Sequence, residues 1–191
     1  MKWDKAKWGS RGRQYCRYLL DEFQNANFKM TWAMPVRWVP PIDPWYKINF
    51  DGVTFASNQS SEIGAITCGH EGRVEVALIT TLCIPLGSLE TEAKALEEGV
   101  FFAWDMGVRD VIFECDSKNV SYAMNSFSEP PIAIGNIIQG TWQKLLDFRS
   151  VRVSHVRKKG NCPTHILAQY TRYIDGYVIW IEKILNILFL S

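Results

Sequence analysis

The order of extended and helical segments constrains the fold of this chain more than any other feature. Residues 45–84 contain three β-rich runs, WYKINFDGVTF, EIGAITCG and RVEVALITTLCIP. In the first run, apolar and polar residues alternate with the period of two expected of a half-buried strand. From residue 88 onward the periodicity becomes helical, and helical segments alternate with the runs VRDVIFECD and SVRVSHV. The resulting order, βββαβααβα, predicts an α/β domain with a mixed five-stranded sheet flanked by helices.

The chain divides into three parts by composition. It has 191 residues and is 47% hydrophobic, which is enough for one buried core with extensions. We predict an N-terminal helix and a proline- and tryptophan-rich linker over residues 1–44, a folded domain over residues 45–175, and an apolar tail over residues 176–191. Charged residues interrupt the tail, which is shorter than a bilayer-spanning helix, so we expect no membrane contact.

Charge and cysteine content place further limits on function. The formal net charge is +1, so a nucleic-acid contact would come from a local patch rather than from the overall field. The five cysteines form no CxxC pair, and several lie in apolar runs, which favours a reducing, intracellular location, nuclear or cytoplasmic. Phosphate-binding glycine loops and nucleophile elbows are absent from the sequence, so we expect no small-molecule cofactor. We also expect a monomer.

Three carboxylates lie where a carboxylate needs a compensating partner. Asp51 is in the middle of the first predicted strand, where aspartate is disfavoured. Glu92 lies on the inward stripe of the first predicted helix, together with Leu96 and Val100. Asp116 follows the buried run VIFEC and precedes a helix. Because clustered carboxylates repel unless a cation neutralises them, and oxygen ligands suit Mg²⁺ or Mn²⁺, the three together predict a metal site.

Each of these residues, taken singly, also has an ordinary structural explanation. Asp51 would then be a solvated residue on the outer face of the sheet, and Glu92 a residue at the helix boundary. Asp116 would be the N-cap of the helix that follows it. In the same way, we interpret His155 on the fifth strand as structural, and Asn161 as the N-cap of the last helix.

Four motifs in this order resemble the type 1 ribonuclease H domain. They are KINFDG around Asp51, TEAKALEEGV around Glu92, ECDSKNV around Asp116 and HVRKKGNCPTHILAQ around His165. The lead-in WVPPIDPWYKINFDG is similar to that of the plant retroelement-derived branch, which is associated with non-LTR reverse transcriptases. The resemblance covers roughly residues 38–175 and implies a ribonuclease H-like fold for the domain over residues 45–175.

The resemblance also implies an activity, which is hydrolysis of the RNA strand of RNA–DNA hybrids with two divalent ions, Mg²⁺ or Mn²⁺, about 4 Å apart. Asp51 would bridge both ions, and Glu92 and Asp116 would complete the first site. The fourth family position, an aspartate that helps to hold the second ion, is His165 in this chain. Imidazole nitrogen suits Mn²⁺ better than Mg²⁺. We therefore predict a nuclease whose activity depends on whether His165 can replace the aspartate.

Candidate nucleic-acid contacts lie beside the same motifs. They are Ser88, Ser117, Lys118, Asn119, Arg157, Lys158 and Lys159. Basic side chains suit phosphates, and hydroxyls and amides suit the backbone and the 2′-hydroxyls of RNA, although a merely solvated basic loop explains residues 157–159 equally well. The alternatives to a nuclease are a catalytically inactive nucleic-acid-binding domain and a degenerate retroelement fragment.

Overall fold

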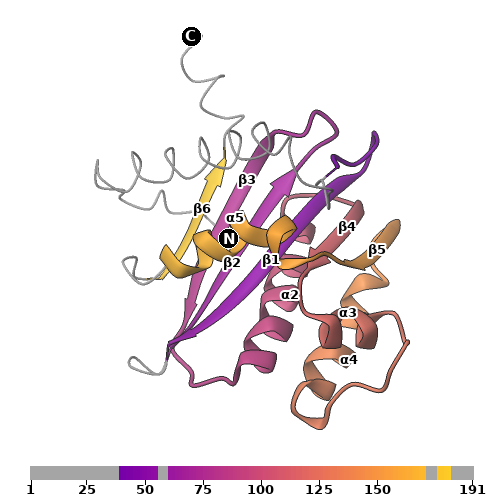
Figure 1. The fold of residues 1–191 in the computed structure, drawn as a ribbon. Helices are drawn as coiled ribbons and strands as arrows, with labels where there is room; N and C mark the ends of the chain where they lie inside the picture. Colours follow the sequence, from indigo (N-terminus) through magenta and orange to yellow (C-terminus); the bar gives the residue numbers. More distant parts are fainter. Residues whose placement is uncertain (1–38, 56–59, 171–175, 182–191) are drawn as a thin grey trace.

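The computed structural model describes residues 39–55, 60–170 and 176–181, and the predicted N-terminal helix lies outside them. In chain order the elements are β1 Tyr46–Phe55, β2 Ser60–Cys68, β3 Val74–Leu82, α2 Ser88–Asp105, β4 Asp110–Cys115, α3 Lys118–Met124, the 3₁₀ helix η1 Ile132–Ile134, α4 Gly135–Leu145, β5 Ser150–His155, α5 Lys158–Tyr170 and β6 Tyr177–Ile181. The strands form one mixed sheet in the order β5-β4-β1-β2-β3-β6 (Figure 1). The predicted α/β order, βββαβααβα, is confirmed up to α5.

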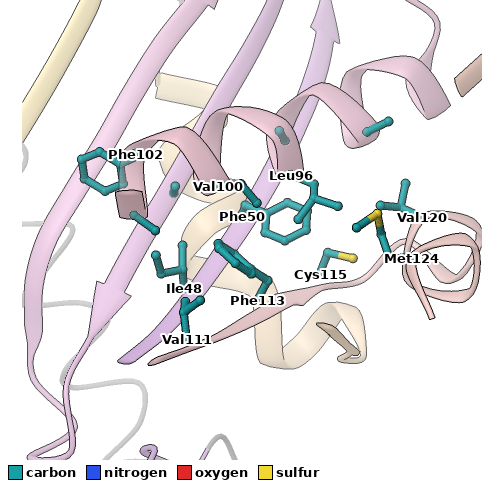
Figure 2. Close-up of a cluster of buried hydrophobic side chains, with 14 of the residues drawn as sticks. Ile48, Phe50, Leu96, Val100, Phe102, Val111, Phe113, Cys115, Val120 and Met124 are labelled. Carbon is teal, nitrogen blue, oxygen red and sulfur yellow. The ribbon is translucent and has the colours of Figure 1, made fainter. Parts of the chain in front are cut away.

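The alternation of residues along β1 places a helix on each face of the sheet. Ile48 and Phe50 are fully buried on the face that α2 covers, where they pack with Leu96 and the other core side chains shown in Figure 2. Asn49 and Asp51 point to the opposite face, where their side chains contact α5. α2 and α5 therefore enclose β1 from both sides (Figure 1). The polar residues Asn49 and Asp51 on one face of β1 thus meet a helix rather than solvent.

The sheet has six strands rather than the five predicted from the sequence. The extra strand, β6, pairs antiparallel with β3 from Val76↔Ile181 to Thr80↔Tyr177. It comes from the first part of the predicted apolar tail; residues 182–191 lie outside the described part. The run YVIWI is rich in β-branched and aromatic residues and covers the edge of β3, which would otherwise leave its backbone groups unpaired. Among the described residues, none of the helices combines the length and the apolar character that crossing a membrane requires.

The last helix begins earlier than predicted, so Asn161 is not its N-cap. α5 starts at Lys158, and Asn161 lies inside the first turn, where it is almost fully buried. Its side-chain amide donates to the Phe50 carbonyl at 3.0 Å, so the side chain is committed to the sheet rather than to the start of its own helix. Part of the predicted basic loop thus belongs to the first turn of α5.

Candidate metal centre

Asp51 lies in the middle of β1 with only 2% of its surface exposed, which excludes the alternative of a solvated outer-face residue. Both carboxylate oxygens have a donor within the chain. The Gly52 backbone N–H donates to Oδ1 at 2.9 Å, and the His165 ring nitrogen Nδ1 lies 2.6 Å from Oδ2. A buried carboxylate requires such partners, because removing it from water without them is costly.

A glycine beside Asp51 brings the start of α2 against β1. A Cβ atom on Gly52 would lie 2.6 Å from the side chain of Thr91 and 2.7 Å from its backbone carbonyl oxygen, closer than real Cβ contacts allow. Only a residue without a side chain fits at that distance. Since Thr91 precedes Glu92, this close approach sets how near Glu92 comes to Asp51.

The Thr91 hydroxyl anchors the first turn of α2 to the sheet. It lies 3.0 Å from the Gly87 carbonyl oxygen, 3.1 Å from the Ser61 hydroxyl and 2.9 Å from the Thr54 hydroxyl. Ser61 is on β2 and Thr54 on β1, so the turn is tied to two strands at once. Glu92 is therefore positioned by hydrogen bonds that its neighbour makes.

A second glycine, Gly64 on β2, likewise allows a helix, α5, to lie close to the sheet. Gly64 is the cross-strand partner of Asp51. A Cβ atom on Gly64 would lie 2.9 Å from the Ala168 nitrogen and 3.0 Å from the Thr164 carbonyl oxygen, both in the backbone of α5. The absence of a side chain lets α5 pack directly on β2, and this brings His165 within reach of Asp51.

Asp116 lies where two parallel strands stop pairing. β4 pairs with β1 from Tyr46 to Asn49, the ladder ends there, and Asp116 follows the last residue of β4. The N-cap of α3 is Ser117, and no side-chain hydrogen bond caps that helix, so Asp116 does not have the capping role considered above. The His155 ring nitrogen Nε2 lies 3.2 Å from the Asp116 carbonyl oxygen, which gives this histidine the partner that the sequence did not assign.

The three predicted carboxylates converge. One ligand oxygen from each of Asp51, Glu92 and Asp116 lies within 4.8 Å of the other two. Burial, followed by the charges of Asp51 and Asp116, raises the pKa of Glu92 to about 9, against a small opposing effect of Lys158. Burial and Asp116 likewise raise the pKa of Asp51, against the opposing effect of His165. The cluster is therefore short of positive charge.

The same cluster contains oxygen atoms that the chain leaves without a partner. Glu92 Oε2 and Asp116 Oδ1 are buried and accept no hydrogen bond. Buried polar atoms are nearly always paired, so such exceptions need an explanation. A hard cation that takes oxygen ligands would pair both atoms and neutralise the cluster, so the donor set fits Mg²⁺ or Mn²⁺.

His165 is half-exposed on α5 at the side of Asp51. Its Nδ1 faces Asp51, and its other ring nitrogen, Nε2, lies 3.0 Å from the side-chain amide nitrogen of Gln169, one helical turn further on. Within the described part of the chain, the group that could hold a metal ion consists of the three carboxylates alone. The predicted fourth site residue is thus adjacent to Asp51, on the opposite side of its carboxylate from Gly52.

A buried polar network joins the sheet to the first turn of α5. Lys47 makes a 2.8 Å ion pair with Glu114, and the Asn49 amide lies 3.3 Å from both Glu114 and the Asn161 side-chain oxygen. Asn161 in turn donates to the Phe50 carbonyl, one residue beyond the β1–β4 ladder. The amide thereby satisfies a backbone group at the point where β1 loses its neighbour.

The predicted nucleic-acid contacts lie on three separate segments of the chain. They lie at the start of α2 (Ser88), at the start of α3 (Ser117, Lys118, Asn119) and at the start of α5 (Arg157, Lys158, Lys159). All are exposed except the half-buried Ser117. Lys158 is close enough to Glu92 to oppose the rise in its pKa. Ser88 thus lies one helical turn before Glu92, Lys118 lies two residues after Asp116, and Lys158 acts on Glu92 from the start of α5.

Sequence reasoning missed several residues that support the site. They are Asn49, Thr91, Asn161 and Gln169. A signal for two of them was present, because Asn161, His165 and Gln169 repeat every four residues and must share one face of a helix. One face of α5 therefore carries three polar side chains in successive turns.

Comparison with known proteins gives the family. No curated protein matches the chain. Among solved structures, RNase H1 from Halobacterium salinarum superimposes with a TM-score of 0.63 at 18% identity, covering 68% of this chain and 98% of that one. An N-terminal RNase H domain from Mycobacterium tuberculosis gives 0.60 at 17% identity, covering 66% and 91%. LC11-RNase H1 in complex with an RNA/DNA hybrid gives 0.60 at 12%, covering 65% and 94%.

These structural neighbours confirm the predicted ribonuclease H-like fold. The family model described as reverse transcriptase-like matches residues 49–171, a segment that contains Asp51, Glu92, Asp116 and His165. The match supports the predicted link to retroelements, while the plant branch stays a prediction. More than half of the chain is covered by the match, and the chain therefore belongs to the reverse transcriptase-like family of ribonuclease H-like domains.

Proposed function

We propose that this protein is a nuclease that depends on divalent cations and hydrolyses the RNA strand of RNA–DNA hybrids. The observation that carries the proposal is the convergence of Asp51, Glu92 and Asp116, with two buried oxygens that lack a partner. Such a cluster needs a positive charge from solution, because without that charge the pKa of Glu92 is raised to about 9.

The site residues have distinct roles in this proposal. Asp51, Glu92 and Asp116 would hold the cations, which when bound activate a water molecule and stabilise the leaving 3′ oxygen. Lys118, at the start of α3, and Lys158, at the start of α5, are exposed and flank the carboxylates. Their charges would attract the phosphates of the nucleic-acid backbone without reading its sequence.

The proposed substrate class rests on two supports. LC11-RNase H1, which shares the fold, was solved in complex with an RNA/DNA hybrid. In this chain, Ser88 at the start of α2 and Asn119 on α3 are exposed polar groups of the kind that reach the 2′-hydroxyls of RNA. We further propose that the domain acts as a monomer in a reducing, nuclear or cytoplasmic setting.

A second function, binding of hybrids without turnover, is favoured by one observation. His165 stands at the position of the fourth acidic residue, and its ring contacts Asp51 instead of adding a negative charge to the site. A domain that binds only through its lysines and arginines would be sensitive to salt and indifferent to chelator. Loss of hybrid binding on chelation would therefore favour the nuclease.

The decisive experiment is a cleavage assay on hybrids labelled separately on the RNA and DNA strands, with Mg²⁺ and then Mn²⁺. The matched control is Asp51→Asn, which keeps the shape of the side chain and removes its charge. We expect cleavage of the RNA strand alone, and its loss in the variant. A folded protein that binds the hybrid and cleaves neither strand with either ion would establish the binding function instead.

A further inference from the structure

The ring of His165 is held between two groups of the chain. Nδ1 lies 2.6 Å from Asp51 Oδ2, and Nε2 lies 3.0 Å from the Gln169 amide nitrogen. An amide nitrogen can only donate a hydrogen bond, so the Nε2 atom that faces it must accept with its lone pair. The proton of the neutral ring is then on Nδ1, which donates to Asp51.

This arrangement leaves the ring without a lone pair for a metal ion. Nδ1 carries the proton, and the lone pair of Nε2 faces Gln169 on the side of the ring away from Asp51. An imidazole binds a metal through an unprotonated nitrogen, so neither ring atom is available in this geometry. Within the described residues, moreover, His165 is not part of the group of ligand atoms that could share an ion.

The rest of α5 fixes the ring in place. Asn161, one turn before His165, is 1% exposed and donates to the Phe50 carbonyl. Gly64 lets the α5 backbone on either side of His165 pack on β2. One polar stripe on α5 is therefore formed by Asn161, His165 and Gln169. Asn161 binds the helix to the sheet, His165 contacts Asp51, and Gln169 orients the ring of His165.

We propose that His165 is a positioning residue rather than a metal ligand: its Nδ1–H group, oriented by Gln169, fixes the direction in which the Asp51 carboxylate meets the cation. Hydrogen-bond partners of this kind orient metal ligands and tune the affinity of a site. The inference rests on the metal site of the proposed function, and it assigns that site to three carboxylates. It offers a different role for His165 from the fourth-ligand role that the family resemblance implies.

The first test reads the ring directly, by nitrogen NMR of the His165 imidazole in the full chain, metal-free and then saturated with Mg²⁺. We expect a protonated Nδ1 and an unprotonated Nε2 in both states. If Mg²⁺ removed the Nδ1 proton, or shifted the unprotonated nitrogen as direct coordination does, His165 would be a ligand and the proposal would be overturned. The spectrum of the metal-free chain does not depend on nuclease activity.

The second test measures Mg²⁺ affinity by calorimetry without nucleic acid. His165→Ala should weaken binding about tenfold, and His165→Asn, whose amide places a donor near the original Nδ1, should restore most of the loss. Gln169→Leu should weaken binding less than His165→Ala, whereas the same substitution at the exposed Gln143 of α4 should leave it unchanged. Equal losses in His165→Asn and His165→Ala would overturn the positioning role.

The two tests also separate this inference from the proposed function. A chain that binds Mg²⁺ with the expected pattern in the variants, yet cleaves no hybrid, would overturn the nuclease and support the role of His165. A chain that cleaves the RNA strand while His165→Asn and His165→Ala bind Mg²⁺ equally poorly would support the nuclease and overturn the positioning role.

Discussion

The two ends of β4 carry aspartates in opposite electrostatic situations. At one end, the Asp110 carboxylate accepts hydrogen bonds from the Arg149 guanidinium, which lowers its pKa. At the other end, Asp116 faces Asp51 and Glu92, and one of its buried oxygens has no partner. The first aspartate has its cation from the chain, whereas the second lies in a cluster that needs a cation from outside. Burial alone therefore does not distinguish a structural carboxylate from a functional one, but the source of its counter-charge does.

Exchanging each aspartate for asparagine should separate the two ends most sharply. Asp116→Asn should lower hybrid cleavage about a thousandfold, since it removes several kcal/mol of charge interaction from the metal site, and should leave the melting temperature of the metal-free chain unchanged or raised. Asp110→Asn should do the reverse, lowering the melting temperature while cleavage stays within about twofold. Equal effects of both variants on cleavage would contradict the comparison.

The next largest effect should come from replacing Gly52 and Gly64, the two glycines that let α2 and α5 pack closely beside Asp51. Gly52→Ala and Gly64→Ala would each press a Cβ against a helix backbone, so we expect the free energy of unfolding to fall by about 1–3 kcal/mol and Mg²⁺ affinity to fall about tenfold. The control is Gly99→Ala on α2, where the nearest atoms lie 3.9 Å away. Denaturant titration and calorimetry on all three variants measure both quantities.

Gly99→Ala should instead stabilise the chain slightly, because alanine favours a helix by about 0.8–1 kcal/mol over glycine. It should leave Mg²⁺ affinity unchanged, since no part of α2 has to move. If Gly99→Ala weakened Mg²⁺ binding as much as Gly52→Ala does, the close approach of α2 to β1 would not be what sets the geometry of the site.

The carboxylate cluster and Asp110 should also respond to pH with opposite signs. The pKa of Glu92 is raised from 4.5 to about 9, so the metal-free folded chain keeps a proton that the unfolded chain releases, and stability falls as pH rises between those values. The pKa of Asp110 is lowered, so its contribution is present above about 3.8 and is lost as pH falls. Thermal unfolding between pH 5 and 8 should therefore show a decline that Mg²⁺ suppresses.

Glu92→Gln tests the assignment of that decline to the carboxylate cluster. The variant should be more stable than the wild type by about 1–2 kcal/mol at pH 8 without metal, and its stability should respond little to Mg²⁺. Persistence of the full decline in this variant would show that another group causes it. The matched substitution Glu90→Gln, two residues earlier on α2, should leave the decline as it is.

The carboxylate cluster was predictable because each carboxylate conflicts with its local environment in the sequence. A mid-strand Asp51 and an inward Glu92 break the expected pattern of apolar residues, and the break is visible without coordinates. The contact of Asn161 with the Phe50 carbonyl and that of His155 with the Asp116 carbonyl were not predictable, because a backbone carbonyl carries no signal in the side-chain sequence. The sequence thus shows which residues need partners better than it shows which residues provide them.

The same distinction explains the sixth strand. The run YVIWI is apolar throughout, and such a short run suits a buried strand, a helix or a tail equally well. What makes it a strand is the edge of β3, about a hundred residues earlier in the chain, with which it pairs from Val76 to Thr80. An open edge is a property of the assembled sheet, so no local sequence pattern predicts which segment will pair with it.

The smallest effect we predict concerns His155, whose ring contacts the Asp116 backbone. His155→Ala removes one hydrogen bond, at 3.2 Å, from the segment that carries Asp116, so Mg²⁺ affinity should fall only about threefold. His155→Gln, whose amide can donate from nearly the same place, should recover it. Because β5 already holds this segment through the Val156 N–H to the Cys115 carbonyl at 2.8 Å, the fold should survive both changes. Calorimetry on His155→Ala and His165→Ala side by side measures the loss of Mg²⁺ affinity in each. Equal losses would mean that the position of Asp116 depends on β5 as much as the position of Asp51 depends on α5.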